Sequence, residues 1–222
     1  MQIKIDKLIR SKRRTIALIV ERDGSLTVRA PKRAAAVEIE SFIHEKAGWI
    51  FRTQEKIKSS IVIPNKQFVS GENFLYLGNE YELRLVPPQR PVLKFDGGFT
   101  LGYSAKPRGE QAFIRWYKQR AFSIISERVG LFSQGYGFTP KQVKISSART
   151  RWGSCSPDGT LNFTWRLVMA PLEVVDYVVV HELVHLRVKN HSSRFWGEVE
   201  KIMPGYKERR KWLRVHGERL NI

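Results

Sequence analysis

The sequence predicts an α+β protein, because strand patterns dominate its first half and helical patterns its second. Residues 15–31 (TIALIVERDGSLTVRAP) alternate apolar and polar residues on both sides of an Asp-Gly pair, which is a strong signal for a β-hairpin. Residues 110–133 (EQAFIRWYKQRAFSIISERVGLFS) instead carry apolar residues at the spacing of a long amphipathic helix. We therefore expect a β-rich N-terminal module over residues 1–104 and a helix-dominated domain over residues 105–222.

The N-terminal module begins with two or three short strands in residues 1–30, and its hairpin turns at Asp23-Gly24. Residues 34–57 then place apolar side chains at helical spacing. The rest of the module consists of extended segments and turns: two strands over 68–88 joined around Gly78-Asn79, a third strand near 91–103, and a linker over 104–110.

The C-terminal domain combines helical segments with one pair of strands. Its first helix ends near Gly135, and residues 142–171 have the pattern of strand, turn at Pro157-Asp158-Gly159 and strand. Pro171 opens the next helix, which extends to residue 188 and is apolar on nearly every face, so we expect it to be buried. Two shorter helices follow, over residues 193–202 and 206–219, and the second of them is basic.

Length and composition are those of a globular protein with one substantial domain and a small appended module. The chain has 222 residues, of which 42% are hydrophobic, so it can bury a sizeable core. Its apolar runs are too short for a membrane-spanning helix, and the first residues lack the continuous apolar region of a secretory signal. The single cysteine, Cys155, cannot form an internal disulfide and fits a reducing compartment. We therefore expect a cytoplasmic protein with no membrane partner.

The chain is strongly basic: 39 Lys and Arg against 21 Asp and Glu give a net charge of +18. Such a field attracts nucleic acid, nucleotides and other anions. The excess is concentrated in KLIRSKRR (residues 7–14) and in residues 201–222. These two segments suggest weak, sequence-independent nucleic-acid binding, and the alternative is that they form an ordinary solvated basic surface.

The stretch HELVHLRVKNH, residues 181–191, contains three of the five histidines of the chain. Helical positions four residues apart differ by about 40° around the axis, so His181 and His185 project from one face and can bind a single Zn²⁺. Glu182 lies beside that face and can reach a metal-bound water without being a ligand. In such a site the metal lowers the pKa of its water, the glutamate accepts the proton, and the metal polarises a scissile carbonyl. The alternative is a buried helix whose histidines bond backbone carbonyls, but burying these groups without a strong partner would cost several kcal/mol.

A catalytic zinc usually has three protein ligands, and His191 is the third ligand that we expect. His191 can reach the other two histidines only if the helix stops before it, since a continuing helix would point it away. Asn190 tolerates the left-handed conformation found at helix ends, and Ser192 can cap the next helix. The competing ligands are Glu198 and Glu200 on the following helix.

Residues 151–196, RWGSCSPDGTLNFTWRLVMAPLEVVDYVVVHELVHLRVKNHSSRFW, resemble the signature of the YgjP-like metallopeptidase domain family. Members of that family carry an R-W-G-S-C strand, a following L-N strand, a DYVVxHELxH helix and an NHSxxFW segment. The chain resembles the SprT-like and WLM peptidases more distantly. The resemblance implies a zincin-like metallopeptidase domain, zinc at His181, His185 and His191, and Glu182 as the general base.

The segment over residues 149–156 precedes the proposed zinc helix and should form strands beside it, where an edge strand can bind extended substrate backbone. Arg149 and Arg151 either meet a substrate carboxylate or phosphate or pair with acidic groups of the core. Gly153 is expected to serve backbone geometry. We expect Cys155 to be a small buried thiol, since a fourth zinc ligand would close the open coordination position. Three aromatic side chains are expected to serve packing: Trp152, Trp165 and Tyr206.

The sequence therefore predicts a zinc-dependent metallopeptidase that hydrolyses peptide or protein substrates with metal-activated water. One alternative is a metal-dependent hydrolase of a phosphorylated substrate such as a nucleoside triphosphate, which the basic charge would suit although the sequence contains no glycine-rich phosphate loop. Another alternative is a nucleic-acid-associated protein with a structural zinc site, but such sites prefer four closed ligands with more cysteine.

Overall fold

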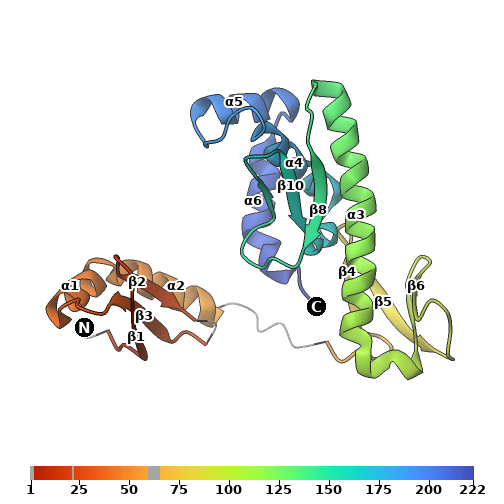
Figure 1. Ribbon diagram of the computed structural model, residues 1–222. Coiled ribbons are helices and arrows are strands. Elements are labelled where there is room, and N and C mark those ends of the chain that lie inside the picture. The colour runs from red at the N-terminus through yellow and green to blue at the C-terminus, as the bar shows by residue number, and fades with distance from the viewer. Residues whose placement is uncertain (1–2, 22, 60–65) are drawn as a thin grey trace. The chain divides into compact units, whose positions relative to one another are not determined.

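The computed structural model describes residues 3–21, 23–59 and 66–222, and the chain divides into two compact units, residues 1–64 and 65–222 (Figure 1). The α+β class is confirmed, since helices accompany three small sheets. The boundary between the units lies before the strands of residues 73–102, whereas the expected module extended to residue 104. These strands belong to the same unit as the helices that follow them.

The first unit contains a three-stranded sheet. Its strands are β1 (Lys7–Ser11), β2 (Ala17–Val20) and β3 (Leu26–Pro31). They pair in the order β1-β3-β2, with β1 parallel and β2 antiparallel to β3. The hairpin predicted around Asp23-Gly24 is therefore confirmed, and Gly24 has the left-handed φ of 83° that a tight turn favours.

Two helices, α1 (Ala36–Glu45) and α2 (Ala47–Ser59), follow the sheet where helical spacing was found over residues 34–57. The break falls at Lys46, whose ψ of 7° ends α1. Apolar side chains of both helices meet alternate residues of β3, because every second residue of a strand faces the same side. The buried core of this unit consists of Leu26, Val28, Ala30, Ile39, Ile43 and Ile50.

The second unit begins with a four-stranded sheet of order β4-β5-β7-β6. The predicted strand pair is confirmed, and its turn has φ angles of 48° at Leu77 and 84° at Gly78, as a two-residue hairpin of type I′ requires. The strand expected near residues 91–103 is two strands, because the chain turns at Gly97. The four strands are β4 (Asn73–Tyr76), β5 (Asn79–Val86), β6 (Leu93–Phe95) and β7 (Phe99–Gly102).

Residues 104–110 are not the linker that the sequence suggested. A 3₁₀ segment, η1 (Tyr103–Arg108), leads directly into the long helix α3 (Gly109–Tyr136). Close packing explains the difference, because a Cβ on Gly109 would lie 2.5 Å from Cγ of Phe68. The glycine thus permits a tight helix start and does not mark a flexible connection.

Aromatic packing joins the four-stranded sheet to α3. Phe113 of the helix stacks on Phe74 with ring centroids 4.0 Å apart and lies 5.0 Å from Phe99. The Tyr117 hydroxyl donates to the Leu75 carbonyl at 2.6 Å. These aromatic side chains are buried and hold the four-stranded sheet against α3, so the sheet belongs to the second unit.

A second sheet lies beside α3 (Figure 1). Strands β8 (Gln142–Ser146) and β10 (Thr160–Thr164) pair in parallel, and β9 (Gly153–Cys155) pairs antiparallel with β10. The order β8-β10-β9 makes β9 an edge strand. The predicted turn at Pro157-Asp158-Gly159 is confirmed, since the Ser156 N–H donates to the Thr160 carbonyl across it at 2.9 Å.

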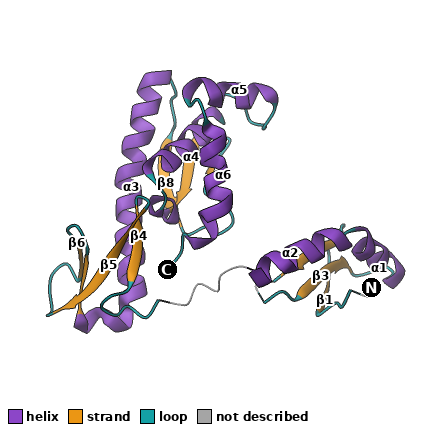
Figure 2. Cartoon of the chain, turned by 180° about the vertical axis from the view of Figure 1, so that it is seen from behind, coloured by secondary structure: helices purple, strands orange, loops and turns teal. Residues whose placement is uncertain are grey.

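Helix α4 (Leu172–Val184) packs against α3 and β9 and against the helical segments before and after it in the chain, and it is largely buried, as its apolar faces predicted. Asp176 of α4 accepts two hydrogen bonds from the Arg128 guanidinium of α3, at 2.6 and 2.8 Å. Helices α5 (Ser193–Ile202) and α6 (Tyr206–His216) lie near α4 (Figure 2). Two 3₁₀ segments, η2 (Trp165–Met169) and η3 (Gly217–Arg219), complete the second unit.

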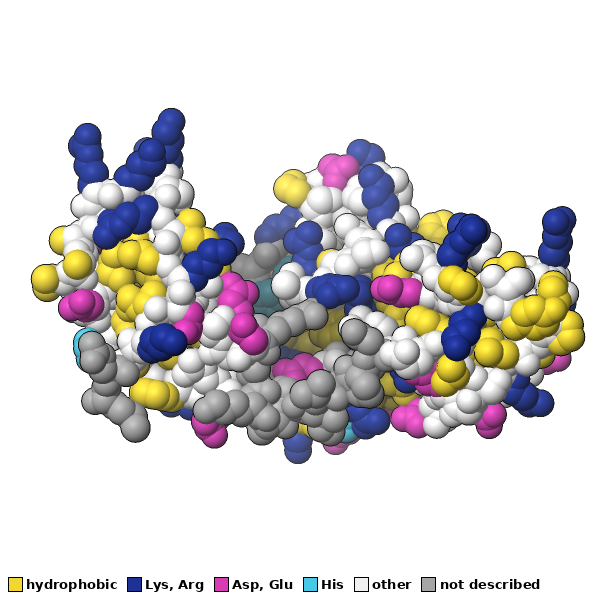
Figure 3. Space-filling model, turned by 90° about the horizontal axis from the view of Figure 1, so that it is seen from below, with side chains coloured by type: hydrophobic (Ala, Val, Ile, Leu, Met, Phe, Trp, Pro, Cys, Tyr) yellow, Lys and Arg dark blue, Asp and Glu magenta, His cyan; other side chains and the backbone are white. Residues whose placement is uncertain are grey.

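The helices of the described residues include none that is long and apolar enough to cross a membrane. Lys and Arg side chains project from the face seen in Figure 3, with smaller groups of acidic side chains between them. Over the whole chain, the excess of Lys and Arg over Asp and Glu gives the net charge of +18.

Candidate metal centre

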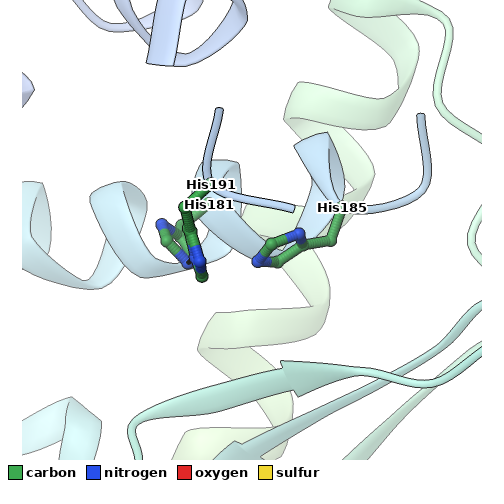
Figure 4. A group of neighbouring side chains, drawn as sticks. All are labelled: His181, His185 and His191. Atoms are coloured by element: carbon green, nitrogen blue, oxygen red, sulfur yellow. Dashed lines mark hydrogen bonds between the residues drawn. The ribbon is translucent and has the colours of Figure 1, made fainter. Parts of the chain in front are cut away.

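Three histidine side chains converge at the C-terminal end of α4. His181 and His185 come from the helix and its C-cap, and His191 comes from the loop before α5 (Figure 4). The ring centroids of His181 and His185 are 4.9 Å apart, and His191 lies 4.9 and 4.7 Å from them. One nitrogen of each ring lies within 4.8 Å of the others. The structure thus brings together the three histidines that the sequence singled out.

The chain reverses before His191 because α4 ends early. The last helical residue is Val184, and the Val188 N–H still donates to the Val184 carbonyl at 2.9 Å. The prediction of a left-handed conformation at Asn190 is wrong, since the φ angle of this residue is not positive. Its side-chain oxygen instead accepts a hydrogen bond from the Ser192 N–H at 3.3 Å. Ser192 is the N-cap residue of α5, as expected, although its hydroxyl makes no capping bond.

Aromatic side chains of α5 close one side of the histidine cluster. Phe195 is fully buried, and its ring centroid lies 4.9, 4.5 and 4.8 Å from the three imidazoles. Trp196 stacks on His191 with centroids 5.6 Å apart. These contacts orient the imidazoles and exclude water from one side of them.

Burial favours the neutral form of the helix histidines, which is the form that binds metals. Burial lowers the pKa of His181 to about 3, with smaller contributions from His185 and His191. The pKa of His185 is also lowered, mainly by burial. Nδ1 of His185 contacts the Val188 carbonyl at 3.0 Å. Because a carbonyl only accepts, the proton lies on Nδ1 and leaves Nε2 free to bind a metal.

Glu182 lies on α4 next to the histidines, and only 5% of its surface is exposed. Its Oε2 atom has no hydrogen-bond partner in the described part of the chain. Burial raises the pKa of Glu182 to about 8, against the opposing effect of the Arg151 charge. A carboxyl group whose pKa is near neutrality can both accept and return a proton.

Strand β9 passes close to Glu182. A Cβ on Gly153 would lie 2.6 Å from Oε1 and 2.7 Å from Cγ of Glu182, closer than real Cβ atoms approach. The φ of Gly153 is not left-handed, so this glycine does not serve a turn. Gly153 instead leaves space for the glutamate side chain.

The competing ligands do not join the histidines. Glu198 pairs with Lys201 at 2.7 Å, and neither Glu198 nor Glu200 belongs to the cluster found among the described residues. Cys155 is also outside this cluster and is a free thiol that is only half-buried. Burial raises the pKa of Cys155.

The other singled-out side chains divide between core and surface. Trp165 and Tyr206 are buried, as expected. Trp152 is only partly buried and lines a cleft beside the histidines. Arg149 and Arg151 are exposed, and the ion pairs of the described residues include neither, although the charge of Arg151 acts on the buried Glu182.

The cleft beside His181 and Glu182 has a volume of about 640 Å³. Helix α6 forms one side of it. Sequence patterns did not reveal that this basic helix faces the histidines, although positive charges recur along it at helical spacing. The cations that line the cleft are Lys207, Arg210, Lys211 and Arg214.

A model of the YgjP-like metallopeptidase domain matches residues 14–216. The chain therefore belongs to the YgjP-like metallopeptidase domain family, as the resemblance implied.

Two solved structures are similar to parts of the chain. One is the crystal structure of the metallopeptidase zymogen of Pyrococcus abyssi abylysin, at 27% identity over 42% of this chain and 93% of that chain, with a TM-score of 0.38. The other is the metallopeptidase zymogen of Methanocaldococcus jannaschii jannalysin, at 22% identity over 42% of this chain and 95% of that chain, with a TM-score of 0.35. No curated protein matches the chain significantly.

Proposed function

We propose that the chain is a zinc-dependent metallopeptidase that cleaves peptide or protein substrates. His181, His185 and His191 are the proposed metal ligands, and Glu182 is the proposed general base. The observation that carries the proposal is the convergence of three imidazoles beside a buried carboxylate, within the matched metallopeptidase domain.

The residues of the cluster fit a zinc ion. Two nitrogens on one zinc lie no more than about 4.2 Å apart, because each Zn–N bond is about 2.0–2.1 Å long. Nε2 of His181 faces Nε2 of His191 at 3.0 Å, and the three rings offer nitrogens within 4.8 Å of one another. Small side-chain adjustments therefore suffice. Three nitrogen ligands also leave the fourth position open, as in catalytic zinc sites.

Glu182 supplies the acid–base chemistry in this proposal. A zinc ion held by the histidines would polarise the scissile carbonyl and lower the pKa of a water molecule. Glu182 accepts the proton of that water and returns it to the leaving amine. Close packing against Gly153 fixes the position of the carboxyl group, and the positive charge of Arg151 opposes the upward shift that burial causes in its pKa.

Strand β9 provides a means to align the substrate. It is an edge of its sheet and lies against Glu182 through Gly153. An extended peptide can add to a strand edge through main-chain hydrogen bonds, while pockets beside the strand receive its side chains. We propose that substrate binds along β9 in this way, with its scissile carbonyl near the histidine cluster.

Replacing Glu182 by glutamine tests this function. The amide cannot accept the proton but has nearly the same volume, so Glu182→Gln protein should keep its fold and zinc while its hydrolysis of casein falls by at least about 10²-fold. Glu200→Gln, at an exposed position of α5, is the matched control and should keep its activity. Near-normal turnover by the Glu182→Gln protein would contradict the proposed general base.

A metal-dependent hydrolase of a phosphorylated substrate is a second candidate, favoured by the four Lys and Arg side chains that line the cleft. Cationic donors form strong hydrogen bonds with phosphate oxygens. If wild-type protein released phosphate or pyrophosphate from a nucleoside triphosphate, lost this activity in the Glu182→Gln variant and cleaved no peptide, the second candidate would replace the first.

A further inference from the structure

Helix α6 places a row of positive charge along the cleft. Lys207, Arg210, Lys211 and Arg214 line the cleft, and all four are exposed. Their spacing of three and four residues sets them on one face of the helix. The row extends over about 10 Å, since a helix rises about 1.5 Å per residue. These four residues are the basic row.

The basic row lacks acidic partners within the described residues. No ion pair there includes any of its four side chains, and on the same helix Glu208 pairs with Arg209 instead, at 3.8 Å. Glu182 is the one acidic residue among those that line the cleft. Like charges four residues apart on a helix repel each other. The row is therefore a surface that an anion entering the cleft would stabilise.

Arg210 connects the basic row to the histidine cluster. Its guanidinium lies 4.7 Å from the ring centroid of Trp196, and Trp196 stacks on His191. His181 lines the same cleft as the row. One substrate molecule could therefore place an anionic group on the basic row and its reacting bond at the histidines.

We propose that the basic row selects peptides with acidic side chains at alternate positions near the scissile bond. This inference rests on the peptidase function proposed above for the same cleft. In an extended peptide, every second side chain faces the same side at a spacing of about 6.6 Å. Lys207 and Lys211 are about 6 Å apart along the axis of α6, as are Arg210 and Arg214. Each pair therefore matches two carboxylates that are two peptide residues apart.

The length of the row favours a peptide over a nucleotide. A nucleoside triphosphate gathers its charge at one end, whereas the row distributes positive charge over about 10 Å. Trp152, which is only partly buried, also lines the cleft and offers aromatic surface to a chain that passes between the charges. An extended acidic peptide uses both features.

Quenched fluorescent peptides of one length test the proposal, with Glu, Gln or Lys at alternate positions around a common central bond. Wild-type protein should cleave the Glu peptide with a kcat/KM about tenfold above that of the Gln peptide, as two or three exposed ion pairs would give. The advantage should shrink as salt rises. In Lys207→Gln/Lys211→Gln protein the ratio should fall to about two. Arg115→Gln/Lys118→Gln removes the same charge from exposed positions of α3 and should keep the wild-type ratio.

The outcomes separate this inference from the function on which it rests. Cleavage of the Glu and Gln peptides at equal rates would overturn the inference and leave the peptidase function standing. If no peptide is cut, anisotropy of the labelled peptides with the same proteins measures the preference without turnover. In that case the peptidase function fails. The inference would still be supported if wild-type protein bound the Glu peptide more tightly than the Gln peptide and only the Lys207→Gln/Lys211→Gln protein lost this preference. Equal binding of the two peptides would overturn the inference. The inference would also be overturned if the wild-type protein hydrolysed a nucleoside triphosphate, the Lys207→Gln/Lys211→Gln protein lost this activity, and the wild-type protein showed no preference for the Glu peptide.

Discussion

Replacing Gly153 by alanine would press β9 against the proposed general base. The new Cβ would lie 2.6, 2.7 and 2.9 Å from Oε1, Cγ and Cδ of Glu182, where ordinary contacts begin at 3.4 Å. The glutamate or the strand must therefore shift by roughly 0.8 Å, because atoms inside their van der Waals contact repel each other. Overpacking of this kind costs about 1–3 kcal/mol of stability. Misplacing a catalytic group by about 1 Å can cost about 10²-fold in rate, so we expect kcat to fall by about 10²-fold while zinc is retained.

Peptide hydrolysis, zinc content and thermal unfolding would be measured on the same samples of the Gly153→Ala protein. Gly130→Ala on α3 is the control, since no atom lies within 4 Å of its added Cβ. That variant should keep its activity and gain about 0.5–1 kcal/mol of stability, because alanine loses less backbone entropy than glycine in a helix. Wild-type kcat in the Gly153→Ala protein would refute the reasoning. Loss of zinc together with activity would also contradict it, since the predicted clash involves Glu182 and not the histidines.

Asp176→Ala should lower the free energy of unfolding, measured in urea, by about 2–3 kcal/mol, because it leaves the partly buried Arg128 guanidinium without its bidentate partner. An unchanged urea midpoint would show that the Arg128–Asp176 pair contributes nothing to stability. Because burial raises the pKa of Cys155, its alkylation by iodoacetamide should be slower at about pH 8 than that of a free cysteine peptide and should keep accelerating above that pH. A rate equal to that of the peptide would contradict the raised pKa. Weak DNA or RNA binding should weaken steeply with salt and when residues 209–211 are changed to glutamine. Absence of binding at about 50 mM salt would leave the basic surface without a nucleic-acid role.

Local patterns predicted most elements of the chain but not how they assemble. The hairpin at Asp23-Gly24 and the long helix α3 follow from turn chemistry and periodicity, which act over short stretches. The boundary between the two units depends instead on packing between residues far apart in the sequence, such as Phe74 and Phe113. Glycine often marks a linker, which is why the sequence predicts one over residues 104–110, whereas Gly109 permits close contact with Phe68.

The histidine cluster was easier to predict than its surroundings. Two of its members lie one helical turn apart, so their proximity is fixed by the helix itself. The roles of Gly153 and of the basic row depend on β9 and α6, which reach α4 from opposite directions along the chain. A pattern within either segment indicates a strand or a basic helix but does not reveal which side chain of α4 it contacts.

Metal analysis of the purified protein tests the proposed three-histidine zinc site most directly. Wild-type and Glu182→Gln protein should each contain one zinc per chain, whereas His191→Ala should lose most of its zinc, because only the two imidazoles of the α4 segment would remain in the cluster. Glu198→Gln is the control for a change in α5 and should keep its full zinc content, since Glu198 pairs with Lys201 outside the cluster. Full zinc content and affinity in the His191→Ala protein would contradict the site and turn attention to Glu198 and Glu200 as the third ligand.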